Sequence, residues 1–63
     1  MPPTTIARLV AAAGGAKPFA AAVGVGERHA YYLKAGKRRM SESVEKLARQ
    51  LAESLGVELT DEL

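Results

Sequence analysis

The sequence predicts an all-α protein, a compact domain of four helices with a short C-terminal tail. Apolar residues recur at helical spacing in four consecutive segments of the 63 residues, and in the first segment they fall at i, i+3, i+4 and i+7, on one helix face. Glycines separate these segments, as expected at helix ends, where glycine adopts the left-handed conformation without steric cost. Strand-like alternation is confined to residues 57–60, and four residues are too few to predict a strand.

The first predicted helix covers the N-terminal segment up to the glycine pair Gly14 and Gly15. Thr4 or Thr5 is its expected N-cap, because a threonine hydroxyl accepts a hydrogen bond from a free N–H of the first turn. One face of this helix is apolar and consists of Ile6, Leu9, Val10 and Ala13.

The second predicted helix is short, about residues 17–23. Pro18 lies in its first turn, where the missing N–H of proline needs no partner. The apolar face of this helix consists of Phe19, Ala20 and Val23.

The third predicted helix follows a brief interruption at residues 24–26 and ends at Gly36. Residues 27–34 contain neither glycine nor proline, so nothing breaks a helix there. Ala30 and Leu33, at i and i+3, are expected to face the core.

The fourth predicted helix begins after the basic residues 37–39 and ends at Gly56. Ser41 or Ser43 is the expected N-cap, and Glu42 and Glu45 lie where negative charge is favourable against the helix dipole. The apolar residues at helical spacing are Val44, Leu47, Ala48, Leu51 and Leu55.

The length and the residue inventory restrict the class of protein. The chain suffices for one domain, residues 1–63, with a small core. Without cysteine, neither a disulfide nor a thiolate metal site can stabilise this core, so helix packing or self-association must do so. There is no signal-peptide pattern and no stretch approaching roughly 20 apolar residues, from which we expect a soluble, cytoplasmic protein with no membrane contact.

Charge is distributed unevenly along the chain, although the net charge is only +2. Residues 1–40 hold seven Lys or Arg and one acid, Glu27, a net charge of +6. Residues 41–63 hold two bases and six acids, a net charge of −4. A basic region of this kind suits a polyanion. Neither an enzyme nor a cofactor or metal site is expected, because there is no cysteine, the single histidine has no carboxylate partner at helical spacing, and the core is too small for a substrate pocket.

Residues 16–35, two short helices with a three-residue turn between them, resemble the helix-turn-helix of Cro and C1-type phage repressors and their small chromosomal relatives. Ala20 matches the position where the two helices approach so closely that only a small side chain fits. Residues 34–40 resemble the basic, glycine-containing stretch that often follows the recognition helix in this group. The other matching residues are Phe19, Val23, Gly24, Val25 and Leu33.

This resemblance implies a sequence-specific regulator of transcription that binds double-stranded DNA, a Cro-like repressor that occupies an operator with its recognition helix in the major groove. The residues that would face base edges are Glu27, Arg28 and Tyr32, with Tyr31 beside them. The residues that would contact phosphates are Lys17, His29, Lys34, Lys37, Arg38 and Arg39.

Each of these residues also has an interpretation without DNA. Tyr31 and Tyr32 diverge by about 100° on a helix, so one of them could cover the core instead. His29 could be a neutral surface residue, and Glu27 an acid that favours the first turn of its helix. The basic residues 34–39 could form a solvated loop.

A homodimer is expected, because one recognition helix buries too little surface for strong specificity, and paired half-sites about 34 Å apart are the usual solution. The candidate dimer surfaces are Leu51 and Leu55 of the acidic fourth helix and Val57, Leu59 and Leu63 of the tail. The same residues could be plain core and frayed end. The alternative functions are a helical protein-interaction module, such as an antitoxin-like or anti-repressor partner, and an RNA-binding or nucleoid-type protein without sequence preference.

Overall fold

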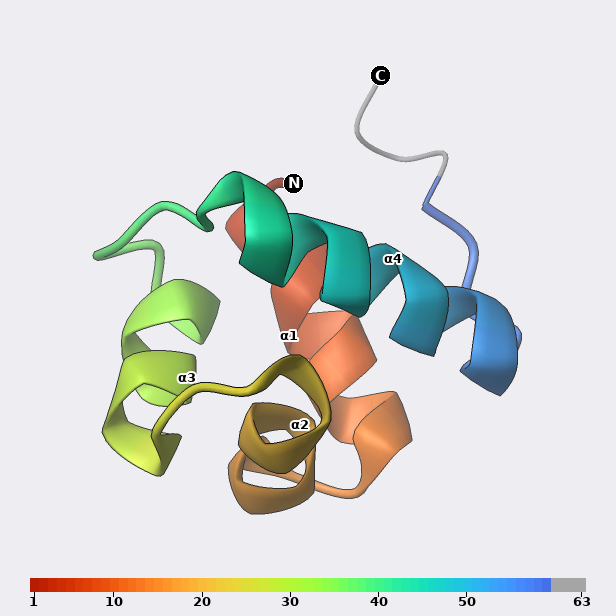
Figure 1. The fold of residues 1–63 in the computed structure, drawn as a ribbon, viewed down its shortest axis with the longest axis horizontal. Helices are drawn as coiled ribbons and strands as arrows, with labels where there is room; N and C mark the ends of the chain where they lie inside the picture. Colours follow the sequence, from red (N-terminus) through yellow and green to blue (C-terminus); the bar gives the residue numbers. More distant parts are fainter. Residues whose placement is uncertain (60–63) are drawn as a thin grey trace.

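Four α-helices and their connections make up the computed structural model, which describes residues 1–59. Within these residues there is no strand, so the predicted all-α class with four helices is confirmed, and the alternating residues 57–59 do not form a strand. Thr60 and Leu63, which belong to the predicted tail, lie outside the described residues. The helices are α1 (Pro3–Ala13), α2 (Ala16–Val23), α3 (Glu27–Lys34) and α4 (Glu42–Leu55) (Figure 1).

The start of α1 differs from the prediction that a threonine caps it. Pro2 is the N-cap, Pro3 is the first helical residue, and no side chain caps the helix. Proline starts the helix before the threonines because its ring fixes φ at a helical value and it has no N–H to satisfy. Thr4 and Thr5 therefore lie inside α1, and the Thr5 side chain is completely buried.

The connections on either side of α2 are made by glycines. Gly14 ends α1 in the left-handed region, with φ 101°, and α2 leaves at an angle of 102° to α1. The turn to α3 consists of residues 24–26, with Gly24 also left-handed (φ 75°) and Val25 partly buried against the core. In the described part of the chain no single helix is long and apolar enough to cross a membrane, although α1 and α2 together reach that length and composition.

Both ends of α4 are capped by predicted residues, and Ser41 rather than Ser43 is the N-cap. The Val44 N–H donates a hydrogen bond of 3.3 Å to the Ser41 Oγ, whereas Ser43, the other candidate, lies within the first turn. Glu42 and Glu45 lie in that first turn as predicted. Gly56 ends α4 in the left-handed region, with φ 73°.

The core lies where α1, α2 and α3 meet, and α4 covers it (Figure 1). Phe19, Leu9 and Leu33 are its largest side chains and are completely buried. The predicted inner faces of the first three helices are confirmed, with Ala13 only partly buried. Because five of the eleven buried apolar residues are alanines, the core contains little side-chain volume for its number of residues. These alanines are Ala16, Ala20, Ala30, Ala48 and Ala52.

The inner face of α4 differs from the predicted one. Ala48 and Ala52 are buried, whereas Leu47 and Leu55 are 40% and 41% exposed and Leu51 is partly buried. The two alanines allow α4 to pack closely on α2 and α1, and this displaces the leucines to one edge of the helix. The predicted stripe is therefore correct for Ala48 and in part for Val44 and Leu51, which pack against the core, but wrong for Leu47 and Leu55. It also omitted Ala52, which is buried.

Candidate nucleic-acid interface

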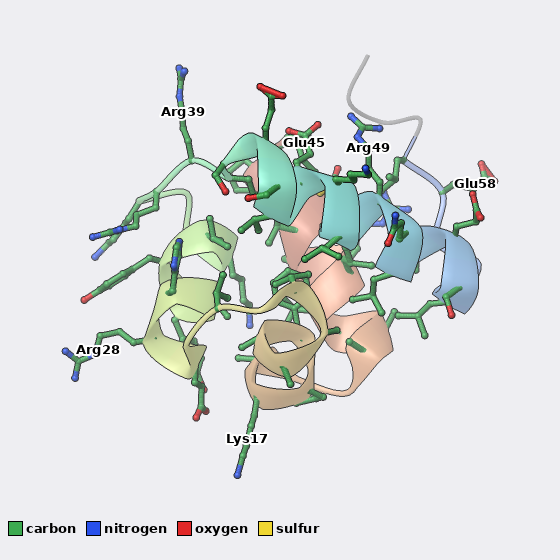
Figure 2. All side chains as sticks on the ribbon, in the orientation of Figure 1. Lys17, Arg28, Arg39, Glu45, Arg49 and Glu58 are labelled. Atoms are coloured by element: carbon green, nitrogen blue, oxygen red, sulfur yellow. The ribbon has the colours of Figure 1, made fainter. Side chains whose placement is uncertain are left out.

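Two buried residues fix the orientation of α3. Ala30 and Leu33 are completely buried, and α3 packs on both α2 and α1 through this inner face. Successive helix residues rotate by about 100°, so the opposite face presents Arg28, Tyr31 and Tyr32. All three are exposed, and Figure 2 shows Arg28 pointing away from the body of the protein. The outer face of α3 is thus held in one orientation without using any of its polar residues.

The two tyrosines of the chain both lie on this outer face. Tyr31 is 53% exposed and Tyr32 is 37% exposed. The alternative in which one of them covers the core is therefore wrong, because Ala30 and Leu33 already fill that space. Both phenol groups remain available to a ligand.

Next to the tyrosines is a hollow of about 380 Å³, open to solvent. The guanidinium carbon of Arg38 lies 6.0 Å from the centre of the Tyr32 ring, within the range of a cation–π contact. Aromatic rings and positive charges therefore alternate over a short stretch of surface. The residues that line the hollow are Tyr31, Tyr32, Lys34, Ala35 and Lys37.

The loop after α3 is held in place by its backbone. The Lys37 N–H donates to the Tyr32 carbonyl at 2.9 Å, and the Gly36 N–H donates to the Leu33 carbonyl at 3.2 Å. Gly36 has φ 78°, and a Cβ at this position would lie 3.0 Å from Cγ of Pro3. A side chain at this position would be strained by the left-handed φ and would crowd the Pro3 ring at the start of α1. The loop cations are thereby kept beside the end of α3.

Arg39 lies apart from the other cations of the basic run. It lines a separate hollow of about 320 Å³ together with Met1, Met40 and Glu45, and Figure 2 shows it pointing in a different direction from Arg28. The basic residues 34–39 therefore do not form one continuous patch. The residues that the structure brings together are Tyr31, Tyr32, Lys34, Lys37 and Arg38.

The remaining predicted contact residues lie around this group. Lys17 is exposed on α2 and points away from the body of the protein (Figure 2). Glu27 is exposed in the first turn of α3, where it also favours the helix dipole, and His29 is half-buried. Sequence reasoning missed the contribution of Pro3 and Ala35, because neither carries a charge or a hydrogen-bonding side chain.

Glu45 of α4 is paired within its own helix. Arg49 donates two hydrogen bonds to one oxygen of Glu45, at 2.8 and 3.1 Å. This hydrogen bonding, and secondly the positive N-terminus, hold the pKa of Glu45 below its usual value. Within residues 1–59 no group of three or more His, Asp or Glu side chains is arranged to hold a metal ion.

Comparison with known proteins adds no further assignment. A scan against protein-family models, a search of curated proteins and a search of solved structures each found no significant match. The fold and the site alone define the class: an all-α, four-helix protein with an exposed basic and aromatic face on α3 and the following loop.

Proposed function

We propose that this protein is a sequence-specific regulator of transcription that binds double-stranded DNA, a Cro-like repressor acting in the cytoplasm. The observation that carries the proposal is the outer face of α3, where Arg28, Tyr31 and Tyr32 are exposed while Ala30 and Leu33 hold the helix from within. Two eight-residue helices with a three-residue turn between them match the length of a helix-turn-helix motif. In this proposal α3 is the recognition helix and lies in the major groove.

The outer face of α3 offers suitable chemistry for base edges. Arg28 can donate two hydrogen bonds to O6 and N7 of guanine, and Glu27 can accept one from N4 of cytosine. The rings of Tyr31 and Tyr32 can pack on a thymine methyl group, and their hydroxyls can bond a phosphate. Because the backbone of α3 is fixed by its inner face, these groups meet the groove with little loss of conformational freedom.

The surrounding cations are suited to the DNA backbone. Lys34, Lys37 and Arg38 lie at one end of α3, His29 lies on α3 at the side of its outer face, and Lys17 lies on α2. Such contacts position the protein and make binding dependent on salt, but they carry no sequence information. Arg39 is expected to contribute least, because it lines a hollow separate from the one beside the tyrosines of α3.

Two protomers are expected to bind one operator. A single α3 offers few base contacts, and pairing the recognition helices about 34 Å apart doubles them on one face of the duplex. No catalytic role is proposed, because the chain has no cysteine and one half-buried histidine.

Tyrosine fluorescence gives a direct test of contact at α3. The chain has no tryptophan, and both of its tyrosines lie on the proposed face. Titration with duplex DNA at low salt should quench this emission in a saturable way, and a Tyr32→Phe variant should retain binding with a smaller signal. The contrary result is a pool of random duplexes that leaves the tyrosine emission unchanged and keeps its electrophoretic mobility when the protein is added. That result would contradict the proposal and favour the protein-interaction module.

Selection of bound sequences from a random duplex pool tests specificity. The proposal predicts enrichment of two related half-sites about one helical turn apart. Binding without any enriched sequence would contradict a specific regulator and favour the nucleoid-type alternative.

A further inference from the structure

The hollow at the C-terminal end of α3 combines two aromatic rings with a small residue between them. Tyr31 and Tyr32 both line it. Ala35 follows them by four and three residues in helical conformation, so it lies between the two rings, one turn further along. Ala35 is exposed, and its single methyl group leaves the space beside the rings open. The volume of about 380 Å³ lies within the range of sites for small ligands, about 300–1,000 Å³.

The charged groups at this hollow are all positive among the described residues that border it. Lys34 and Lys37 line it, and the Arg38 guanidinium lies 6.0 Å from the centre of the Tyr32 ring. The hydrogen bond from the Lys37 N–H to the Tyr32 carbonyl keeps this lysine at the end of the helix. A complementary ligand therefore carries negative charge together with a flat apolar group.

Tyr31 is the ring that is open to such a ligand. It is 53% exposed, against 37% for Tyr32, and Arg38 lies over Tyr32 rather than over Tyr31. An exposed aromatic face binds another flat ring by stacking, and every nucleobase has such a face. A nucleotide meets both requirements of the hollow, because its base can stack on the ring while its phosphate pairs with the lysines.

A regular duplex does not present its bases in this way. Its grooves expose only the edges of the bases, since each face is covered by the next base pair of the stack. Faces become available where bases are unpaired, and proteins recognise single strands by stacking of this kind. The hollow thus differs in its ligand from Arg28 and Glu27, whose polar groups suit base edges.

We propose that this hollow binds one nucleotide of single-stranded DNA, with the base stacked on Tyr31 and the phosphate between Lys34 and Lys37. This activity goes beyond binding to an operator duplex, and only the choice of DNA over RNA rests on the proposed function. At about 0.7 per cation on a single strand, the two lysines and Arg38 predict that log affinity falls with log salt with a slope of about 2.

The test compares short, fluorescently labelled single strands of equal length, by fluorescence anisotropy on the full chain at low salt. Oligo(dT) should bind at least about fivefold more tightly than an abasic strand, which has the same phosphates but no bases. Oligo(dT) should also quench the emission of Tyr31 and Tyr32, the only tyrosines of the chain, more strongly than the abasic strand. Oligo(rU) should bind no more tightly than oligo(dT).

Variants of the hollow separate stacking from charge. Tyr31→Leu should abolish the preference for oligo(dT) over the abasic strand, whereas Tyr31→Phe, which keeps the ring, should retain it. Ala35→Leu fills the space beside the ring and should weaken the binding of oligo(dT). Its matched control is Ala21→Leu on α2, which should leave that binding unchanged. All three positions are exposed, so these substitutions leave the core in place.

Four outcomes overturn the inference: equal binding of oligo(dT) and the abasic strand, a preference that Tyr31→Leu leaves unchanged, equal effects of Ala35→Leu and Ala21→Leu, or tighter binding of oligo(rU). Its failure is distinguishable from failure of the proposed function. A protein that binds duplex DNA without preferring oligo(dT) to the abasic strand retains the regulator and removes the nucleotide site. A protein that prefers oligo(dT) through Tyr31 but binds no duplex does the reverse.

Discussion

Arg28 is exposed in the first turn of α3, one helical turn before Tyr32. If it pairs with guanine, Arg28→Ala should reduce discrimination at one or two base pairs by about 1 to 3 kcal/mol, because a bidentate contact is specific to one base. Binding to random duplex should change much less. Affinities for the selected operator and for versions with single base changes would measure this. Equal weakening on operator and random DNA would instead make Arg28 a phosphate contact.

Arg38 and Arg39 are neighbours in the sequence but lie in different surroundings. The Arg38 guanidinium lies 6.0 Å from the centre of the Tyr32 ring, beside the hollow of α3, whereas Arg39 lines a separate hollow with Glu45. Arg38→Ala should therefore reduce the slope of log affinity against log salt by about 1, because one fewer counterion is displaced. Arg39→Ala, the matched control, should reduce it less. An equal reduction of the salt slope in both variants would show that Arg38 and Arg39 contribute alike to DNA binding, contrary to this prediction.

At the scale of elements, α2 and α3 make the most extensive helix–helix contact of the fold. Ala20 is 3% exposed in α2, so Ala20→Leu adds three carbons to a filled space. Overpacking a core typically costs about 1 to 3 kcal/mol, a large part of the few kcal/mol that a domain of this length has, at roughly 0.05 to 0.15 per residue. Thermal melting should show a clear decrease in stability and DNA binding should be lost.

Ala21 on the same helix provides the control for this substitution. Its side chain is exposed, and Ala→Leu at an exposed helix position is almost neutral in helix propensity. Ala21→Leu should melt with the parent protein. If Ala20→Leu also melted with the parent and still bound DNA, the close crossing of α2 and α3, and with it the helix-turn-helix proposal, would be wrong.

Gly36 and Gly24 form a second matched pair at this scale. Both are left-handed, with φ 78° and 75°, so alanine should cost roughly 1 to 2 kcal/mol in either position. Only at position 36 does the added Cβ also approach another residue, 3.0 Å from Pro3, whereas nothing lies within 4 Å at Gly24. Gly36→Ala should therefore lower the melting temperature more than Gly24→Ala. Equal melting temperatures would show that the loop moves away from Pro3 without cost.

The sequence allowed the helices to be predicted where local rules decide the structure. Glycines mark the end of α1, α2 and α4, and Ser41 caps α4, because these effects depend on a few adjacent residues. The inner face of α3 was also predictable from Ala30 and Leu33. The start of α1 was not, because Pro3 and the threonines are both plausible starting residues, and the burial of Thr5 depends on the rest of the fold.

The candidate site was less predictable, because it depends on contacts distant in sequence. Exposure of both tyrosines follows from how deeply Leu33 is inserted, and separation of Arg39 from Arg38 follows from the path that Gly36 takes beside Pro3. The outward position of Leu47 depends on how closely α4 approaches α2. Helical spacing gives the direction of a side chain but not the distance to the neighbouring helix.

On the scale of the whole molecule, the contact between Glu45 and Arg49 makes stability depend on pH. Glu45 has a pKa below its usual value in the folded protein, so it stabilises the fold above the usual glutamate value. This contribution is lost as the pH falls through the lowered pKa. The effect should be small, about 0.5 kcal/mol or less, because solvent screens a pair of this spacing on a helix surface.

Denaturant unfolding of the parent and of Glu45→Gln between about pH 5 and 3 would measure this contribution, since ordinary carboxylates titrate in that range. The parent should lose more stability on acidification than the variant. Identical losses would mean that the contact with Arg49 does not persist in solution.

The alanine-rich core has a thermodynamic consequence. Heat capacity of unfolding grows with the apolar surface that becomes exposed, and for an average chain of this length it is about 0.8 to 0.9 kcal/mol/K. Five alanines among eleven buried residues place this protein at the lower end. The enthalpy of unfolding of so small a core is low as well, so the transition should be broad and the curve of stability against temperature shallow. DNA that binds only the folded protein would then raise the melting temperature steeply as the DNA concentration increases. Calorimetry would detect such binding as an increase in the melting temperature.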